Sequence, residues 1–239
     1  MLTSYPQEAD YLGTTLPDVG NPLALIVGAG PGLGAALARR YAGAGHDVAL
    51  VARSESKLAG IGEQVRSAGV EAGWTAADVS DAGALRAAVA RLGEHAGRID
   101  VLHFNVVAFR AARVKELTAA DLLDDLAVGA ASLLTAVDAA RPLMSAGSVV
   151  LATGSVTADR PMPSAVSLGV QKAALRNLVA ALDRDLRRDG IRAASVTVRG
   201  TIAAGTPFDP DRIAEVFVQL SANAANAGDE WRTEVPYTG

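Results

Sequence analysis

The stretch LALIVGAGPGLG, residues 23–34, combines an apolar run, a glycine-rich turn and the beginning of a helix. Its glycines Gly28, Gly32 and Gly34 have the spacing G-x-x-x-G-x-G. The beginning of a helix offers unpaired backbone N–H groups and the positive end of the helix dipole, and glycines let a pyrophosphate come close to the backbone. The stretch therefore predicts a dinucleotide-binding turn, with a strand–helix turn that binds nothing as the alternative.

Apolar runs and helical patterns alternate along the rest of the chain. We expect strands at residues 23–27, 47–52, 71–76, 101–105, 148–153 and 192–198, and a last short strand near 232–235. Between and after them we expect helices at residues 33–44, 54–68, 81–95, 118–144, 165–188 and 209–225. This alternation predicts an α/β fold: a Rossmann-like, doubly wound parallel β-sheet with helices on both faces. We expect one NAD(P)-binding domain over residues 23–239, preceded by an irregular N-terminal extension over residues 1–22.

The composition excludes several classes of function. The sequence has no cysteine, so disulfides, thiolate catalysis and cysteine-ligated metal sites are ruled out. Its three histidines are scattered without metal-ligand spacing, and we expect no metal. A net charge of −4 with dispersed basic residues gives no reason to expect nucleic acid or a membrane as a partner. We expect a cytoplasmic protein, because the N-terminal residues lack a secretory signal pattern. We also expect a small molecule as its substrate.

After residue 22 the sequence resembles the short-chain dehydrogenase/reductase family over nearly its full length. The resemblance is carried by the glycine turn, the end of the second strand at Arg53, the segment Ala77-Asp78-Val79-Ser80, and Asn105, Ser155 and Lys172. It implies a nicotinamide cofactor and a homodimer or homotetramer built on the two long helices. It also implies a set of cofactor-binding residues: Gly28, Gly32, Leu33, Gly34, Arg53, Asp78, Val79, Asn105 and Lys172.

The choice between the two nicotinamide cofactors depends on the residue that follows the second strand. An NAD site usually has an acidic residue there for the ribose 2′-hydroxyl, whereas a guanidinium suits the 2′-phosphate of NADP. Arg53 therefore favours NADP(H) over NAD(H), although Glu55 could still serve an NAD site. Two of the implied cofactor residues also have structural alternatives, a turn or helix cap for Asp78 and a tie between strand ends for Asn105.

The resemblance places catalysis on Ser155, which would polarise a carbonyl, and on Lys172, which lies four residues after the position of the family's tyrosine. That position is Leu168, which has no proton to exchange. The asparagine expected in the long helix is also missing, with Ala127 in its place. Ser167, His103, and Tyr5 and Tyr11 of the extension are weaker candidates for a replacement proton donor.

Two functions from different classes follow. The first is an NADP(H)-dependent oxidoreductase acting on a small carbonyl or activated-alkene substrate with a divergent proton donor. The second is an NADP(H)-binding sensor or scaffold without redox turnover.

Overall fold

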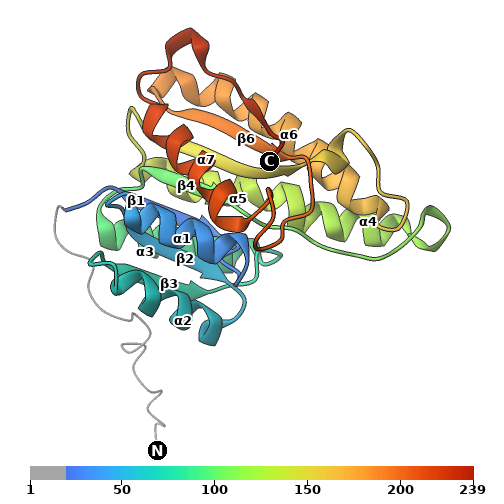
Figure 1. The fold of residues 1–239 in the computed structure, drawn as a ribbon, viewed down its shortest axis with the longest axis horizontal. Coiled ribbons are helices and arrows are strands. Elements are labelled where there is room, and N and C mark those ends of the chain that lie inside the picture. The colour runs from blue at the N-terminus through green and yellow to red at the C-terminus, as the bar shows by residue number, and fades with distance from the viewer. Residues whose placement is uncertain (1–19) are drawn as a thin grey trace, which may run out of the picture.

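Parallel strands form one twisted sheet in the order β3-β2-β1-β4-β5-β6-β7 (Figure 1). The computed structural model describes residues 20–239, so most of the extension expected at residues 1–22 lies outside the described residues, as do Tyr5 and Tyr11. The strands are β1 (Leu23–Val27), β2 (Asp47–Ala52), β3 (Ala72–Ala76), β4 (Val101–Phe104), β5 (Val149–Ser155), β6 (Arg192–Val198) and β7 (Glu234–Tyr237). The strand order reverses between β1 and β4, which opens a crevice at their carboxyl ends. The predicted α/β fold with a parallel sheet is confirmed.

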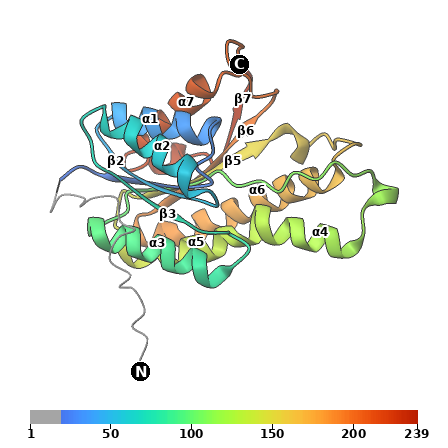
Figure 2. The same cartoon turned by 90° about the horizontal axis from the view of Figure 1, so that it is seen from below.

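Helices cover both faces of the sheet (Figure 2). On one face lie α1 (Leu33–Gly43), α2 (Glu55–Arg66) and α7 (Pro210–Asn223). On the other lie α3 (Ala82–Ala96), α5 (Ser132–Ala140) and α6 (Val166–Leu186), while α4 (Ala119–Leu126) extends beyond the sheet. No helix of the described residues is both long enough and apolar enough to cross a membrane.

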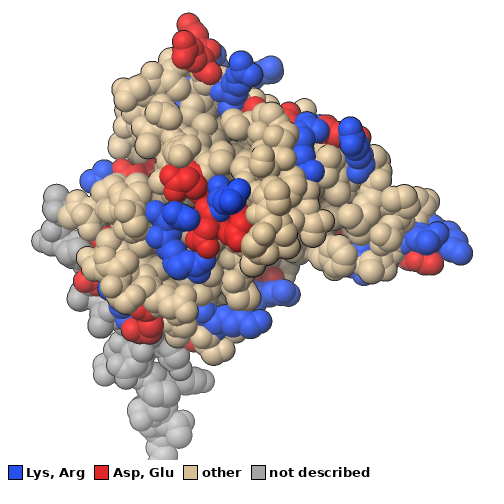
Figure 3. All heavy atoms as spheres, viewed as in Figure 1, with Lys and Arg blue, Asp and Glu red and all other residues tan. Residues whose placement is uncertain are grey.

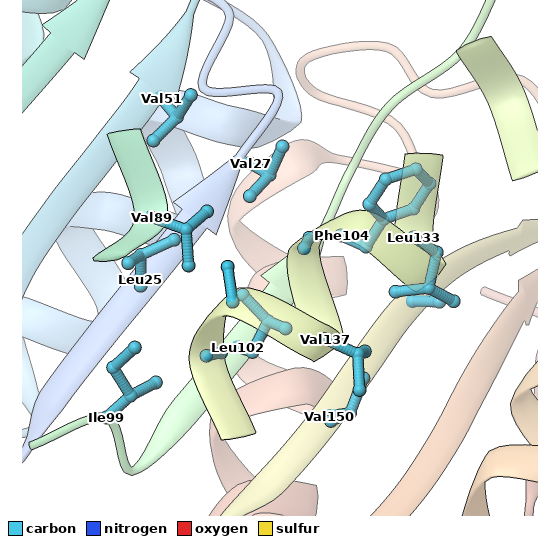
Figure 4. Packing of buried hydrophobic residues seen from close by; sticks show 14 of the residues in the cluster. Leu25, Val27, Val51, Val89, Ile99, Leu102, Phe104, Leu133, Val137 and Val150 are labelled. Atoms are coloured by element: carbon cyan, nitrogen blue, oxygen red, sulfur yellow. The ribbon is translucent and has the colours of Figure 1, made fainter. Parts of the chain in front are cut away.

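The central strands are buried on both faces, which explains why their sequences are continuous apolar runs. Because side chains alternate along a strand, Leu25 and Val27 of β1 pack in one cluster with Val89 of α3 and Val137 of α5 (Figure 4). Ile26, between them, belongs to the cluster under α1 and α7. The two clusters hold β1 rigidly, and with it the glycine turn at its end.

The structure differs from the predicted elements in one important place. The single helix expected at residues 118–144 is interrupted by a π-helical turn, Ala127–Ala131, between α4 and α5. Such turns are common at functional sites. This one is made of alanine, valine and glycine, and nothing in its sequence indicated it. The last strand also lies two residues later than expected.

Charged side chains of both signs lie next to each other on the face that α1 and α7 cover (Figure 3). Ion pairs join these helices there, for example Arg39 Nη2 to Asp211 Oδ2 at 3.0 Å. That face of the molecule therefore shows no large area of one sign. Among the described residues there is no group of three or more side chains placed to hold a metal ion.

Candidate functional site

A cleft of about 700 Å³ opens at the carboxyl ends of β1, β2 and β4, where the strand order reverses. In parallel α/β sheets this crevice is where ligands bind. The residues that line it come from the turns after β1, β2, β3 and β4 and from the π-helical turn: Gly28, Gly30, Gly32, Leu33, Gly34, Ala52, Arg53, Ala77, Asp78, Val79, Ser80, Asn105, Val106, Val107, Ala108, Phe109 and Val128.

The glycines of the first turn have two different roles: two are required by close packing, and two leave open space for a ligand. Gly28 has a φ of +92°, and a Cβ there would lie 2.6 Å from the Asn105 carbonyl oxygen. A Cβ on Gly34 would lie 2.8 Å from Ala29 Cα, so both positions require glycine for packing. By contrast, a Cβ on Gly30 or Gly32 would meet nothing within 4 Å. These two glycines leave open space in front of the N-terminus of α1, which suits a pyrophosphate group.

The end of β2 presents a cation to the cleft and turns an acid away from it. Arg53 is exposed and lines the cleft. Glu55 is not among the lining residues, and its Oε1 accepts a hydrogen bond from the Trp74 indole N–H at 2.7 Å. The acid that could have served an NAD ribose is therefore held against β3.

Asp78 lines the cleft and shapes the turn after β3 as well. Its Oδ1 accepts from the Ser80 N–H at 2.9 Å and from the Ser80 hydroxyl at 2.8 Å. These two bonds, together with the nearby guanidinium of Arg53, hold the pKa of the Asp78 carboxyl below its ordinary value. The N-cap of α3 is a different residue, Asp81.

Asn105 ties three strands together at the bottom of the cleft. Its Nδ2 donates to the Gly28 carbonyl at 3.0 Å, so its Oδ1 is the acceptor for the Thr153 hydroxyl at 2.9 Å. Because Thr153 gives its proton to Asn105, the bond of 3.3 Å between Thr153 Oγ1 and His103 Nε2 is donated by the imidazole. Asn105 thus links the ends of β1, β4 and β5.

His103 is not placed to exchange protons with a ligand. It is fully buried, and its ring packs edge to face against Phe217, with centroids 4.3 Å apart. Burial lowers the pKa of His103 to about 3, so the ring is neutral. Its hydrogen-bond partner is the side chain of Thr153.

Two neighbouring residues of α6 hold the loop after β4. Lys172 is buried and its Nζ donates to the carbonyl oxygens of Thr153 at 2.8 Å and Val106 at 3.2 Å. Burial lowers the pKa of Lys172 to about 8. Gln171, also buried, donates to the Ala108 carbonyl at 2.9 Å and accepts from the Ala108 N–H at 3.1 Å. Val106 and Ala108 line the cleft, so α6 fixes one of its walls.

Ser155 and the first turn of α6 lie close together beside this wall. A Cβ on Gly169 would lie 2.8 Å from the Thr157 carbonyl oxygen, so this glycine lets α6 pack against the turn after β5. Ser155 Oγ accepts from the Thr157 N–H at 3.2 Å and from the Thr157 hydroxyl at 3.0 Å. Leu168 is half-buried in the first turn of α6. Ser155, Leu168 and Lys172 do not line the cleft itself.

Comparison with known proteins decides the family. The family model described as short chain dehydrogenase matches residues 22–207. The chain belongs to the short-chain dehydrogenase/reductase family. The family is one of oxidoreductases with a nicotinamide-binding fold, and the cleft described above is at the place where that fold binds its cofactor.

Individual relatives agree with this assignment. An uncharacterized oxidoreductase of Mycobacterium tuberculosis is 34% identical over 67% of this chain, and the match spans 63% of the relative's own length. A 3beta-hydroxysteroid dehydrogenase of Mediterraneibacter gnavus is 28% identical over 87% of this chain and 75% of the relative. A short chain dehydrogenase of Burkholderia cenocepacia, solved in complex with NADP, has a TM-score of 0.80 at 28% identity and covers 91% of this chain and 96% of its own.

Most of the residues expected to bind a nicotinamide cofactor line this cleft, whereas Lys172 lies behind the wall formed by Val106. Sequence reasoning missed Gly30 and the residues Val107, Ala108 and Phe109. Gly30 lies inside the quoted glycine turn and could have been found by its position. The other three belong to the loop after β4, where Ala108 is held by Gln171 of α6, a residue far away in sequence.

The charged and hydroxyl groups near the cleft mouth are engaged with each other. Arg110 makes two bonds to Asp125, of 3.0 and 3.1 Å, and one to Asp121, of 2.8 Å. Burial raises the pKa of Asp125, but the guanidinium of Arg110 outweighs it and the pKa lies below its ordinary value. Ser167 is fully buried beside this carboxylate, away from the cleft.

Proposed function

We propose that this chain is an NADP(H)-dependent oxidoreductase that transfers a hydride between the nicotinamide and a small carbonyl or activated-alkene substrate. The observation that carries the cofactor choice is the pair of residues after β2. Arg53 lines the cleft, whereas the carboxylate of Glu55 is engaged with Trp74 2.7 Å away. The NADP complex of the Burkholderia relative supports the same choice.

The residues present fit the cofactor. In the proposal, the N-terminus of α1 and the open glycines Gly30 and Gly32 hold the pyrophosphate, Asp78 accepts from the adenine amino group, and Arg53 binds the 2′-phosphate. Lys172 has three ammonium protons and two carbonyl partners, which leaves one N–H for a ribose hydroxyl. When bound, the nicotinamide supplies or accepts the hydride.

Ser155 is the residue that would polarise the substrate. Its oxygen accepts two bonds from Thr157, so its own proton is free to bind a carbonyl oxygen of the substrate. Leu168 has no proton, so protonation would come from water or another group, which makes this member divergent.

The oxidation of NADPH by the purified chain, followed with a panel of ketones, imines and enones, tests this function. Ser155→Ala and Lys172→Ala should each abolish turnover, because they remove the carbonyl donor and the ribose contact. Ser164→Ala, an exposed serine of the same loop, is the matched control and should keep wild-type activity. Full activity in both active-site variants would overturn the assignment.

A second function is favoured by one observation, the leucine at position 168. A sensor or scaffold that binds NADP(H) without turnover would show saturable NADPH binding and no hydride transfer in the same panel. A single reproducible turnover by the wild-type chain would exclude it.

We also propose a homodimer or homotetramer built on the long helices. Large apolar side chains are exposed on α6, at Val170 (39%), and on the two helices that replace the expected long helix 118–144, at Leu123 of α4 (66%) and Leu134 of α5 (49%). Light scattering that finds only a monomer at micromolar concentration would exclude this assembly.

A further inference from the structure

Exposed apolar side chains follow the carboxyl ends of three neighbouring strands. Phe109 and Val107, after β4, are 69% and 49% exposed and line the cleft. Met162, in the loop after β5, is 40% exposed, and Ile202, in the loop after β6, is 38% exposed. Large apolar side chains are otherwise buried along these strands, so their exposure beyond the strand ends is a distinct feature of this edge.

The topology places these side chains on one side of the molecule. β4, β5 and β6 are adjacent and parallel, so the loops that follow them leave from the same edge of the sheet. The loop after β4 and the end of the loop after β5 also touch, because the Val166 N–H donates to the Ala112 carbonyl at 3.2 Å. Ser155, at the end of β5, lies at the same edge.

Two arginines near this apolar edge, Arg110 and Arg199, are already paired with carboxylates. Arg110 bonds to Asp125 and Asp121, as described above. Arg199, directly after β6, lies 3.2 Å from Asp159, which also accepts from Arg176 at 2.7 Å. These arginines therefore have little charge to offer an anionic substrate. Arg160, exposed in the loop after β5, and Arg113 and Lys115, exposed in the loop after β4, are the cations that could oppose this conclusion.

The wall that carries Phe109 is preformed. The residue before it, Ala108, is fixed through both its N–H and its carbonyl by the buried amide of Gln171. Phe109 is thus presented to the cleft without ordering a loop on binding, which lowers the entropic cost of contact with a ligand.

We propose that the substrate is an uncharged carbonyl compound with a hydrocarbon chain, whose apolar part lies against Phe109, Met162 and Ile202 while its oxygen faces Ser155. This inference rests on the proposed oxidoreductase function, because it names the substrate class of that site. Burying each methylene of such a chain strengthens binding about fourfold.

Calorimetric titration with the alkan-2-ones from butanone to octanone, and with oxo acids of matched length, tests the proposal. The ketones should bind about fourfold more tightly for each added methylene, and more tightly than the acids. Phe109→Ser should reduce this gradient, the increase in ketone affinity with each added methylene. Val114→Ser is the control, because Val114 is exposed on the same loop but does not line the cleft, and it should keep the gradient.

The ketone titrations are run without nucleotide and with saturating NADP⁺, which has no hydride to transfer to the ketone, and NADPH binding is measured separately, so that a failure of one proposal can be told from a failure of the other. Absence of NADPH binding would contradict the proposed cofactor. In that case the ketone affinities measured without nucleotide would still test the apolar site. A flat ketone series for the wild type would overturn the substrate class. So would tighter binding of the acids that is lost in Arg160→Ala.

Discussion

Arg53 and Glu55 lie two residues apart after β2, and their different surroundings support the proposal that the cofactor is NADP(H). The sequence places a cation and an acid near the ribose and leaves both nicotinamide cofactors open. The structure separates them, since Glu55 bonds to Trp74 and Arg53 lines the cleft. Trp74 is 19 residues from Glu55 in sequence, and it lies close to Glu55 because β2 pairs with β3. The sequence alone therefore did not indicate this partner.

Lys172 makes the stability of the protein depend on pH in a predictable direction. Its pKa is about 8 in the folded chain, below the ordinary 10.5, because it is buried. Between these values the unfolded chain keeps the proton that the folded chain has lost, so folding becomes more favourable as pH rises. We expect the free energy of unfolding of the wild type, relative to Lys172→Met, to rise with pH between about pH 8 and pH 10.5, by roughly 1 kcal/mol per pH unit, and to level off above that range.

Urea unfolding without nucleotide, at several pH values from 7 upward, measures this difference. Lys57→Met, at an exposed lysine of α2, is the control and should show no such slope. A difference between wild type and Lys172→Met that stays constant with pH would contradict the burial argument.

At the scale of elements, the strands and helices were largely predictable and their interruption was not. Continuous apolar runs such as β1 and β2 indicate strands covered on both faces, and the helix expected from residue 209 is α7, with Asp209 as its N-cap and Pro210 as its first residue. The π-helical turn was missed because no local sequence pattern indicates it, and it packs closely against another helix, α6. A Cβ on Gly129, inside that turn, would lie 1.9 Å from Gln171 Oε1.

This contact predicts a coupled pair of substitutions. Gly129→Ala should destabilise the fold by about 1–3 kcal/mol, because the new methyl group displaces the buried amide of Gln171. Gln171→Ala should cost a similar amount by leaving the backbone groups of Ala108 without their partner. The double variant should cost at least about 1 kcal/mol less than the sum, since the clash no longer exists.

The free energy of unfolding of all four proteins measures this coupling. Gly43→Ala is the control, because a Cβ there would meet nothing within 4 Å, and it should be neutral or slightly stabilising. Strict additivity of the first two substitutions would show that Gly129 does not make room for Gln171.

At the scale of the whole molecule, the glycine turn, the strand ends and the parallel sheet converge on one cleft. The sequence could predict this convergence because the carboxyl ends of parallel strands share one edge. It could not predict the cleft's outer wall. The loop Val106–Phe109 is fixed by Lys172 and Gln171, more than sixty residues later in the chain, and no local pattern shows such a contact.

The central claim is that this cleft binds NADP(H) through Arg53. A fluorescence titration of the wild type with NADPH and, separately, NADH tests it most directly. NADPH should bind more tightly than NADH. Arg53→Ala should weaken the binding of NADPH by about ten- to hundredfold, because a charge-assisted bond to the 2′-phosphate is lost, and should change the affinity for NADH by no more than about twofold. Glu55→Gln, outside the cleft, should leave both affinities unchanged. Tighter binding of NADH, or no binding of either nucleotide, would contradict this account.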